Sequence, residues 1–237
     1  MKKNFLFSCF IIMAVFGYSQ ELLNSNVNEV DGQGRRQGEW KSYDVDGNLK
    51  FEGHFVDNIP VGTFTYYYPN GKVKAISEMH DMGRRSRTKV FHDNGRLMGE
   101  GNYLDKVKDS TWNYYSDFDG LHLSREYYIN GKLDSTVLNF YPNGKVAEEI
   151  PYELGRKEGV WKQYFTDGKL KLKATYINDR LEGLMLIYHL NGVPEVSGMY
   201  KNNFKNGLWI YFNEKGVVNK KETFVRGHLR KTEEGGQ

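Results

Sequence analysis

The chain of 237 residues contains a single cysteine, Cys9, only five prolines, and no sustained run of apolar residues at helical spacing. One cysteine cannot form an intramolecular disulfide, and it excludes a metal site built from several cysteines. The longest apolar run, from Phe5 to Phe16, is shorter than the ~20 residues that are needed to span a bilayer. We therefore predict a protein with no transmembrane segment and with little helix.

Neither sign of charge dominates the sequence. Lysine and arginine total 33, aspartate and glutamate total 30, and the formal charge is +3. A near-neutral chain gives no general reason to expect nucleic acid or an anionic membrane as a partner. A solvated loop is the favoured interpretation of the one local basic cluster, ahead of a grip on an acidic partner. This cluster consists of Arg84, Arg85, Arg87 and Lys89.

The first 19 residues have the layout of a secretory signal peptide, with two lysines, an apolar run, and small residues at Gly17 and Ser19. We predict cleavage after Ser19 and export to the periplasm, the cell surface or the extracellular space. Lipid attachment at Cys9 is the disfavoured alternative, because most of the apolar run follows this cysteine instead of preceding it.

Glycine and aromatic residues are abundant, with 26 Gly, 17 Tyr, 14 Phe and 4 Trp. This composition favours short strands and many turns. Variants of the phrase G-x-W-x-x-Y recur at successive spacings of 24, 24, 24, 25, 24, 24 and 24 residues. They start at Gly38, Gly62, Ser86, Ser110, Ser135, Gly159, Gly183 and Gly207. Eight units therefore fill residues 38–229, and such a period is typical of a solenoid.

Each unit contains a turn sequence such as YPNGK. A two-residue type I′ turn on Asn70 and Gly71 would need Pro69 to donate the closing hydrogen bond, and proline has no N–H. A three-residue loop fits better, with Pro69 and Asn70 in a type I turn and Gly71 at positive φ. We therefore predict one hairpin tip in each unit, with Tyr67 opposite Val73.

The loop length decides which side chains share a face of the sheet, because directly opposed residues point the same way. We predict that Tyr43, Phe51 and Phe55 share an apolar face, and that Trp40 and Glu52 lie on the polar face. Core packing is the favoured role of the Tyr and Phe column. For the aromatic residues of the polar face, binding and packing are about equally favoured. This candidate binding surface consists of Trp40, Phe64, Trp112, Trp161 and Trp209.

The predicted fold class is all-β, an elongated single-layer antiparallel sheet of stacked β-hairpins. Residues 20–37 are predicted to form a linker and an N-terminal edge cap, and residues 230–237 a flexible C-terminal tail. Lysines near the last edge strand would discourage edge-to-edge pairing. The single spacing of 25 places one extra residue between Tyr115 and Tyr128, where we expect a β-bulge or a longer tip.

The repeat resembles the bacterial variant of the MORN repeat, in which a strand and turn of the form G-x-W-x-x-Y-x-x-x-G-x-L are followed by a second strand ending in Tyr or Phe. The resemblance covers nearly all of the predicted mature chain, and its eightfold recurrence makes it specific. Some members of this family carry a label as the antitoxin component of a toxin–antitoxin pair. Such antitoxins normally act in the cytoplasm, which fits poorly with an exported chain.

No group of residues in the sequence predicts catalysis, a metal site or a cofactor site. His92 and His189 occupy equivalent positions four units apart, too far from each other to share a metal ion, and the other histidines are scattered. The glycine-rich stretch at 32–40 lacks the spacing of a phosphate-binding loop. We therefore predict a protein that is not an enzyme and holds no cofactor.

The leading hypothesis is a secreted, non-enzymatic repeat scaffold that mediates protein–protein interaction at or outside the cell envelope. The first alternative is a carbohydrate- or cell-wall-binding ribbon that uses exposed aromatic residues. The second alternative, implied by the family label, is an antitoxin-like inhibitor. The expected partner is a protein, with a glycan as the alternative, and neither nucleic acid nor a transmembrane anchor is expected.

Overall fold

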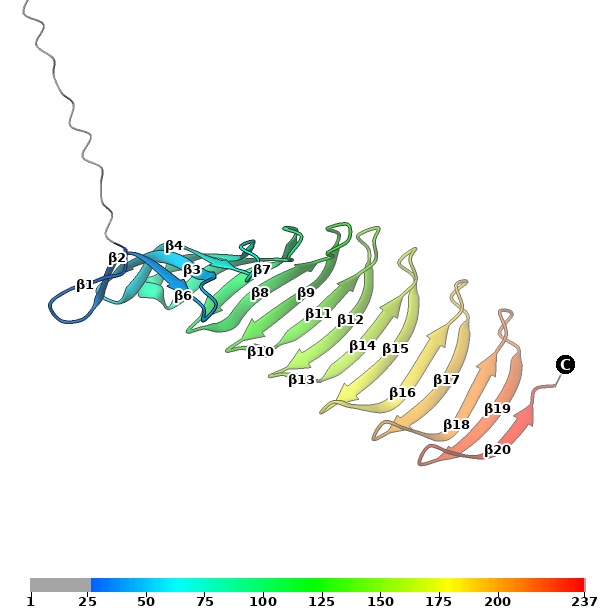
Figure 1. Ribbon diagram of the computed structural model, residues 1–237. Coiled ribbons are helices and arrows are strands. Elements are labelled where there is room, and N and C mark those ends of the chain that lie inside the picture. Colours follow the sequence, from blue (N-terminus) through cyan, green and yellow to red (C-terminus); the bar gives the residue numbers. More distant parts are fainter. Residues whose placement is uncertain (1–26, 237) are drawn as a thin grey trace, which may run out of the picture.

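The computed structural model describes residues 27–236, which form 20 β-strands in one antiparallel sheet (Figure 1). Successive hairpins stack in sequence order along the sheet. The one helical element in this part of the chain is the short 3₁₀ turn η1 (Asp81–Gly83). The predicted fold class, a single-layer all-β sheet of stacked hairpins, is confirmed. The predicted signal peptide lies outside the described residues.

Apart from three two-residue strands, the strands have six to nine residues each. They are β1 (Glu29–Val30), β2 (Arg36–Tyr43), β3 (Leu49–Val56), β4 (Ile59–Tyr67), β5 (Val73–His80), β6 (Arg85–Phe91), β7 (Leu97–Leu104), β8 (Val107–Tyr115), β9 (His122–Ile129), β10 (Lys132–Leu133), β11 (Ser135–Phe140), β12 (Val146–Glu153), β13 (Arg156–Lys157), β14 (Gly159–Tyr164), β15 (Leu170–Ile177), β16 (Arg180–Tyr188), β17 (Pro194–Lys201), β18 (Phe204–Phe212), β19 (Val218–Val225) and β20 (His228–Glu234).

The hairpin tips have the predicted three-residue loop. The N–H of Tyr68 donates to the carbonyl of Lys72 at 2.8 Å, the N–H of Gly71 donates to the carbonyl of Tyr68 at 2.9 Å, and Gly71 has a φ of 80°. Tyr67 lies opposite Val73, as predicted. The extra residue of the fourth unit lengthens its tip, since the corresponding closing bond there runs from Ser116 to Leu121.

The opposite edge of the sheet is formed by shorter turns, which the sequence analysis did not single out. Between β3 and β4 only Asp57 and Asn58 lie outside the ladder, with φ values of 53° and 68°. Two successive positive φ angles define a type I′ turn, and Asn and Asp tolerate this conformation better than most residues. Asn58 also accepts a hydrogen bond from the N–H of Arg36 at 2.8 Å, which ties one hairpin to the previous one.

A β-bulge follows each ordinary tip and was not predicted. In the first unit Tyr43 lies opposite Leu49, but the next pair is Ser42 with Phe51, so Lys50 is an extra residue in β3. An extra residue reverses the alternation of side chains on its own strand. Beyond the bulge, each residue of the first strand therefore lies opposite a residue one position later in the second strand than the sequence-based prediction has it.

The bulge makes our predicted assignment of side chains to the two faces wrong. Trp40 lies opposite Gly53 and shares a face with Phe51 and Phe55, whereas Tyr43 lies on the opposite face with Glu52. One face, here called the tryptophan face, carries the column Trp40, Phe64, Thr88, Trp112, Val137, Trp161, Met185 and Trp209. The other, here called the tyrosine face, carries Tyr43, Tyr67, Phe91, Tyr115, Phe140, Tyr164, Tyr188 and Phe212.

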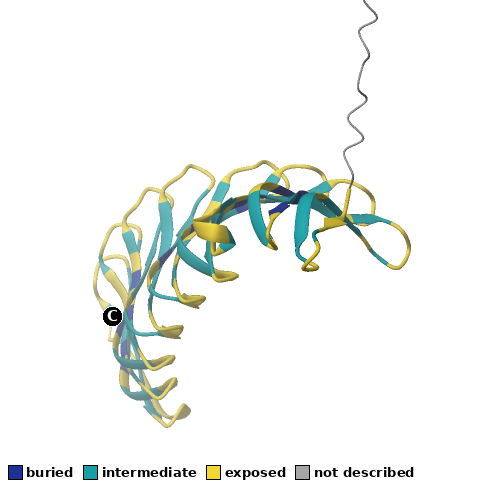
Figure 2. Cartoon of the chain, turned by 90° about the vertical axis from the view of Figure 1, so that its left-hand side faces the viewer, coloured by how far each residue is buried: buried dark blue, intermediate teal, exposed yellow. Residues whose placement is uncertain are grey.

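The sheet curves along its length, and its buried residues follow the middle of the strands while the turns at both edges are exposed (Figure 2). At the N-terminal edge, β1 pairs with β2 through Glu29 and Gln37, within the segment predicted to hold an edge cap. At the C-terminal edge, β20 continues to Glu234 and is exposed throughout. The flexible tail predicted for residues 230–237 therefore starts too early, because residues 230–234 belong to a strand.

Candidate functional site

In three junctions between hairpins, an aromatic ring lies directly over a glycine of the preceding strand. The pairs are Phe64 over Gly53, Trp112 over Gly101 and Trp209 over Gly198. A Cβ atom added at these glycines would lie 2.4, 2.4 and 2.1 Å from the ring atoms. Each of the three rings is at most 2% exposed. These positions need glycine for space, and the ring–glycine pairs form part of the core of the sheet.

A second type of bulge brings each ring over its glycine. In the β7–β8 junction, Glu100 pairs with Asn113 and Asn102 pairs with Asp109, so Gly101 faces three residues of β8. The first of these three, Ser110, has a φ of 59°. The same arrangement recurs in the β3–β4 and β17–β18 junctions, where the residue with positive φ is a glycine.

The tryptophan rings over Gly101 and Gly198 are each held by three contacts, here called the cradle: a tyrosine ring, a backbone carbonyl and a lysine. Tyr103 packs edge-on against Trp112 with ring centroids 5.1 Å apart, and the indole Nε1–H donates to the carbonyl of Asn102 at 2.9 Å. The ammonium group of Lys108 lies 4.9 Å from the indole, and burial lowers the pKa of Lys108. The Trp209 cradle repeats this arrangement with Tyr200, Met199 and Lys205. A small floor, a flanking ring and a cation therefore make a site for one aromatic ring.

The structure brings the five predicted aromatic residues together in the tryptophan-face column, but not on an exposed polar face. Phe64, Trp112 and Trp209 are buried. Trp161 is half-buried against Tyr176, and its Nε1–H donates to Glu148 at 2.8 Å. The half-buried Trp40 donates to the carbonyl of Glu29 at 3.3 Å. The predicted exposure is wrong because of the tip bulge, and a role of these residues in binding stays a prediction.

The third unit departs from this pattern. Thr88 stands where the fourth unit has Trp112, and Ser77 stands in the place of Gly101. Their hydroxyl groups are hydrogen-bonded at 2.8 Å, and both residues are buried. The β5–β6 ladder is regular from Ala75 to His80, with no bulge. The two residues that form the bulge elsewhere instead lengthen the turn, which here comprises residues 81–84.

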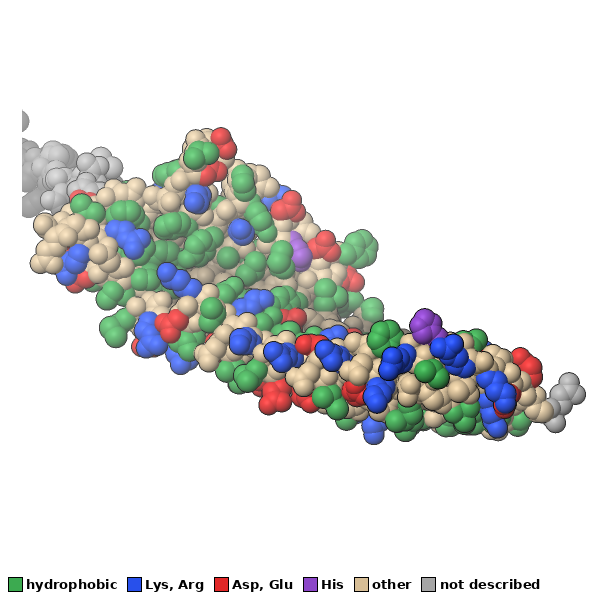
Figure 3. Space-filling view, turned by 90° about the horizontal axis from the view of Figure 1, so that it is seen from below, with side chains coloured by type: hydrophobic (Ala, Val, Ile, Leu, Met, Phe, Trp, Pro, Cys, Tyr) green, Lys and Arg blue, Asp and Glu red, His purple; other side chains and the backbone are tan. Residues whose placement is uncertain are grey.

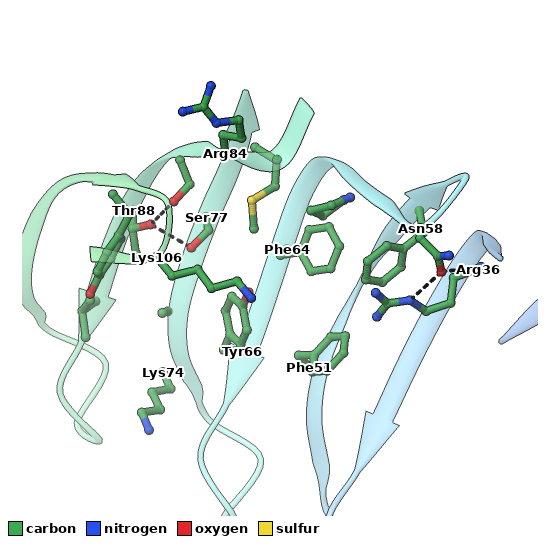
Figure 4. A pocket seen from close by; sticks show the side chains of 18 residues that line it. Arg36, Phe51, Asn58, Phe64, Tyr66, Lys74, Ser77, Arg84, Thr88 and Lys106 are labelled. Atoms are coloured by element: carbon green, nitrogen blue, oxygen red, sulfur yellow. Dashed lines mark hydrogen bonds between the residues drawn. The ribbon is translucent and has the colours of Figure 1, made fainter. Parts of the chain in front are cut away.

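A hollow of about 750 Å³ on the tryptophan face lies over this hydroxyl pair (Figure 4). Phe64 and Tyr103 line it on either side of Ser77 and Thr88. At the turn, Gly83 lies so close to the Pro60 ring that an added Cβ would be 2.5 Å from it. Figure 3 shows hydrophobic side chains gathered in a hollow over the N-terminal half of the sheet. Replacing one ring by a hydroxyl thus opens a concave surface between aromatic walls.

Among the residues that the structure describes, four basic residues line the hollow and no acidic residue does. Arg84 is paired with Asp105 through two hydrogen bonds of 3.1 Å, an interaction that raises the pKa of Arg84 and lowers that of Asp105. The guanidinium carbon of Arg36 lies 3.9 Å from the Phe55 ring centroid. The other two are Lys74 and Lys106, and Lys106 reaches across the hollow toward Tyr66 (Figure 4).

None of the ion pairs formed within residues 27–236 involves Arg36, Lys74 or Lys106. The hollow therefore combines aromatic walls with three cations that form no ion pair with a carboxylate in the described part of the chain. Such a surface has a positive potential and favours a ligand of negative charge.

The tyrosine face presents a different surface, in which hydroxyl groups are bound to carboxylates of the preceding hairpin. Tyr164 donates to Glu149 at 2.8 Å, and Lys162 donates to the other oxygen of the same carboxylate at 2.9 Å. Tyr67 makes the equivalent hydrogen bond to Glu52, which raises the pKa of Tyr67 to about 12. These polar pairs connect neighbouring units.

Two of the histidines have a structural role that the sequence analysis missed. The Nε2 atom of His92 is 3.3 Å from the carbonyl oxygen of Tyr115, and that of His189 is 3.0 Å from the carbonyl oxygen of Phe212. Each contact joins one hairpin tip to the next. The 24-residue spacing was the available signal, because Tyr68 holds the equivalent position and donates to the carbonyl of Phe91.

Within the described range, 27–236, no group of three or more His, Cys, Asp or Glu side chains is arranged to hold a metal ion. No helix in the same range is both long enough and apolar enough to cross a membrane. The hollow on the tryptophan face is the concave site on which we base the functional argument.

A protein-family profile described as the MORN repeat variant matches five segments of the chain, at residues 36–57, 60–81, 133–154, 157–178 and 181–202. These segments correspond to the first, second, fifth, sixth and seventh units. The third unit, which contains Thr88, lies outside the matched segments. No curated protein matches the chain.

Two solved structures show a faint likeness. The chain aligns with an alternansucrase in complex with isomaltononaose at 13% identity and a TM-score of 0.19, over 82% of this chain and 15% of the other. It aligns with a TcdB2-TccC3-Cdc42 crystal structure at 10% identity and a TM-score of 0.15, over 84% of this chain and 18% of the other. The chain thus spans less than a fifth of either protein, and scores this low carry no argument.

Proposed function

The chain belongs to the MORN repeat variant family, and on this basis we propose that it is a non-enzymatic scaffold whose repeats bind another protein. MORN repeats suggest a protein-binding role. The observation that carries the proposal is the single-layer sheet, in which each hairpin contacts its neighbours and no second layer formed by residues 27–236 covers either face. A solenoid of this kind offers a long continuous surface to a large partner.

We also propose that the protein is exported and acts at or outside the cell envelope. The support comes from the sequence alone, with two lysines, an apolar run and small residues before position 20. The mass of the intact secreted protein tests this proposal. A chain that begins at Gln20 supports it, and a chain that retains Cys9, with or without a lipid, overturns it.

A pull-down followed by direct binding tests the scaffold. The chain starting at Gln20 is immobilised, envelope proteins are captured, and the main captured protein is purified and titrated against the chain in solution. A saturable one-to-one complex supports the proposal. If no captured protein binds the purified chain, the proposal is wrong.

Carbohydrate binding is the second candidate, because two half-buried aromatic residues, Tyr66 and Tyr103, line the hollow. The hydroxyl groups of Ser77 and Thr88 lie between them. Sugar rings commonly stack on aromatic side chains. The two hydroxyl groups, however, already bond to each other at 2.8 Å, which leaves them less free to bond to a sugar. A glycan array decides between the candidates, since clear binding of an oligosaccharide would favour this second function.

A further inference from the structure

The protein itself shows what its tryptophan face accommodates. In the β7–β8 and β17–β18 junctions, a tryptophan ring lies between a small residue below it, a tyrosine 5.1 or 5.2 Å from it, and a lysine 4.9 or 4.3 Å from it. The β5–β6 junction keeps the small floor, at Ser77. It also keeps a flanking side chain, Met79, and a cation, Arg84, at the positions equivalent to Tyr103 and Lys108. What differs is the central residue, Thr88, which supplies no ring.

The hollow over Thr88 therefore has room for an aromatic ring that comes from elsewhere. Tyr66 and Tyr103 line the hollow from the two neighbouring junctions, and both are half-buried, so they provide faces or edges against which such a ring can pack. The volume of about 750 Å³ leaves space for more than one side chain. An occupant that consists of a ring with flanking residues uses this space better than a ring alone.

The charges around the hollow specify what should flank the ring. Arg36, Lys74 and Lys106 line it without a carboxylate partner in the described part of the chain, and no acidic residue lines it. Lys74 and Lys106 are exposed, so they can turn toward a ligand at little cost. Carboxylates on either side of the aromatic residue would complement these cations, whereas basic flanks would be repelled.

We propose that this hollow binds an extended segment of the partner protein that carries an aromatic side chain between acidic residues. The inference rests on the proposed scaffold function and names the chemistry of its partner. A single-layer sheet cannot enclose most of the surface of a free small ligand, as a typical small-molecule pocket does. A segment of a larger protein gains the missing contacts along the face of the sheet.

The first experiment is a titration of the ¹⁵N-labelled chain with the peptide acetyl-Glu-Trp-Glu-amide, followed by amide chemical shifts. Saturable shifts should centre on Ser77, Thr88 and the adjacent strands. Two control peptides, acetyl-Lys-Trp-Lys-amide and acetyl-Glu-Ala-Glu-amide, should bind at least about tenfold more weakly. Equal affinity of the three peptides, or shifts centred elsewhere on the sheet, would overturn the proposal.

Two double variants test the same proposal, so that the result does not depend on whether either one of them folds. Thr88→Trp combined with Ser77→Gly places the chain's own ring in the hollow, and it should weaken peptide binding at least about tenfold. Lys74→Glu combined with Lys106→Glu changes only exposed side chains, should melt like the wild type, and should weaken binding by a similar factor. Wild-type affinity in the charge variant contradicts the proposal even if the first variant does not fold.

Three further outcomes distinguish a failure of this inference from a failure of the proposed function. If indole-3-acetate binds as tightly as the peptide, the occupant is a free aromatic acid and the partner segment is wrong. If a captured partner binds the Thr88→Trp, Ser77→Gly variant as tightly as the wild type, the scaffold function stands but the inference fails. If the peptide binds as expected but no captured protein binds the purified chain, the scaffold function fails, and with it the assignment of the peptide chemistry to a partner protein.

Discussion

The β5–β6 and β7–β8 junctions are neighbours in the sheet, yet they use the same number of residues in different ways. In β7–β8, Gly101 faces a three-residue bulge and the turn outside the ladder has two residues, Asp105 and Lys106. In β5–β6 the ladder is regular and the turn has four residues. The first arrangement buries Trp112, and the second leaves a hollow over Ser77 and Thr88.

Different units of one repeat array can therefore serve stability and binding: the fourth unit buries a ring, and the third leaves a concave surface. Because the two junctions have equal length, the array keeps its period although the third unit lacks the buried ring of the fourth. In a solenoid, such a local change affects mainly the adjacent units. We therefore expect substitutions at equivalent positions of the two junctions to have very different effects.

The largest difference is expected between Trp112→Ala and Thr88→Ala. Trp112 is 1% exposed, and removing its ring should lower the free energy of unfolding by about 3–5 kcal/mol. Thr88→Ala removes one partner of the hydroxyl pair and should cost about 1 kcal/mol. Urea unfolding followed by circular dichroism measures both. Similar losses in the two variants would show that the junctions do not differ as described.

The next effect concerns the two faces of one strand. Trp161 packs against Tyr176 and is bonded to Glu148, so Trp161→Ala should cost about 2–3 kcal/mol. Tyr164 lies on the tyrosine face, and Tyr164→Ala should cost about 1 kcal/mol through loss of its bond to Glu149. This order is the opposite of the one that the sequence-based faces imply. If Tyr164→Ala loses more stability than Trp161→Ala in thermal or urea unfolding, the sequence-based assignment of the faces is correct after all.

A smaller effect is expected at the small residue beneath the central position of each junction, which is Gly101 in one and Ser77 in the other. Gly101→Ala puts a Cβ 2.4 Å from the Trp112 ring, and the ring must move, at a cost of about 1–3 kcal/mol. The matched variant Ser77→Ala adds no atom beneath a ring and should cost about 1 kcal/mol or less. Tryptophan fluorescence reports movement of the ring directly. An unchanged emission spectrum in Gly101→Ala would mean that the ring does not lie over this glycine.

The smallest expected effect is a pH dependence of stability that arises from His122 in the fourth unit. His122 occupies the position that Leu97 holds in the third unit; it stacks on Phe140, and its buried Nε2 has no hydrogen-bond partner among the described residues. Burial lowers the pKa of His122 in the folded state. Since the unfolded chain then binds the proton better, stability is complete above the unfolded pKa of about 6.5 and decreases as the pH falls toward the lowered folded pKa.

Urea unfolding at pH 7.5 and 5.5 measures this contribution. The wild type should lose stability at the lower pH, and His122→Leu should lose less, because its side chain does not titrate. If the two proteins show the same difference between the two pH values, the burial of His122 does not contribute to the pH dependence.

The hairpin tips and the stacking order could be predicted from sequence because they depend on local chemistry. Pro69 excludes a two-residue loop, and Gly71 supplies the positive φ that the three-residue loop needs. The faces could not be predicted in the same way. The bulge at Lys50 has no distinctive residue, and a single extra residue reverses every later assignment on its strand.

The hollow was also beyond the sequence analysis, for a related reason. The 24-residue spacing is unchanged in the third unit, so the transfer of two residues from the bulge to the turn leaves no trace in the period. The available signal was a pair of substitutions, Thr88 in the tryptophan column and Ser77 in the column of Gly53 and Gly101. The pairing of a large ring with glycine, and of Thr88 with Ser77, becomes visible only when it is known which residues of the two columns lie opposite each other.

The most direct test of the central claim is the protection of single cysteines by the captured partner protein. In a chain carrying Cys9→Ser, Ser86→Cys places a thiol in the hollow, and Arg87→Cys places one on the tyrosine face of the same strand. The partner should slow the reaction of maleimide with Ser86→Cys at least about tenfold and that with Arg87→Cys less than twofold. Protection of Arg87→Cys with no protection of Ser86→Cys would contradict the account, because the partner would then bind the tyrosine face.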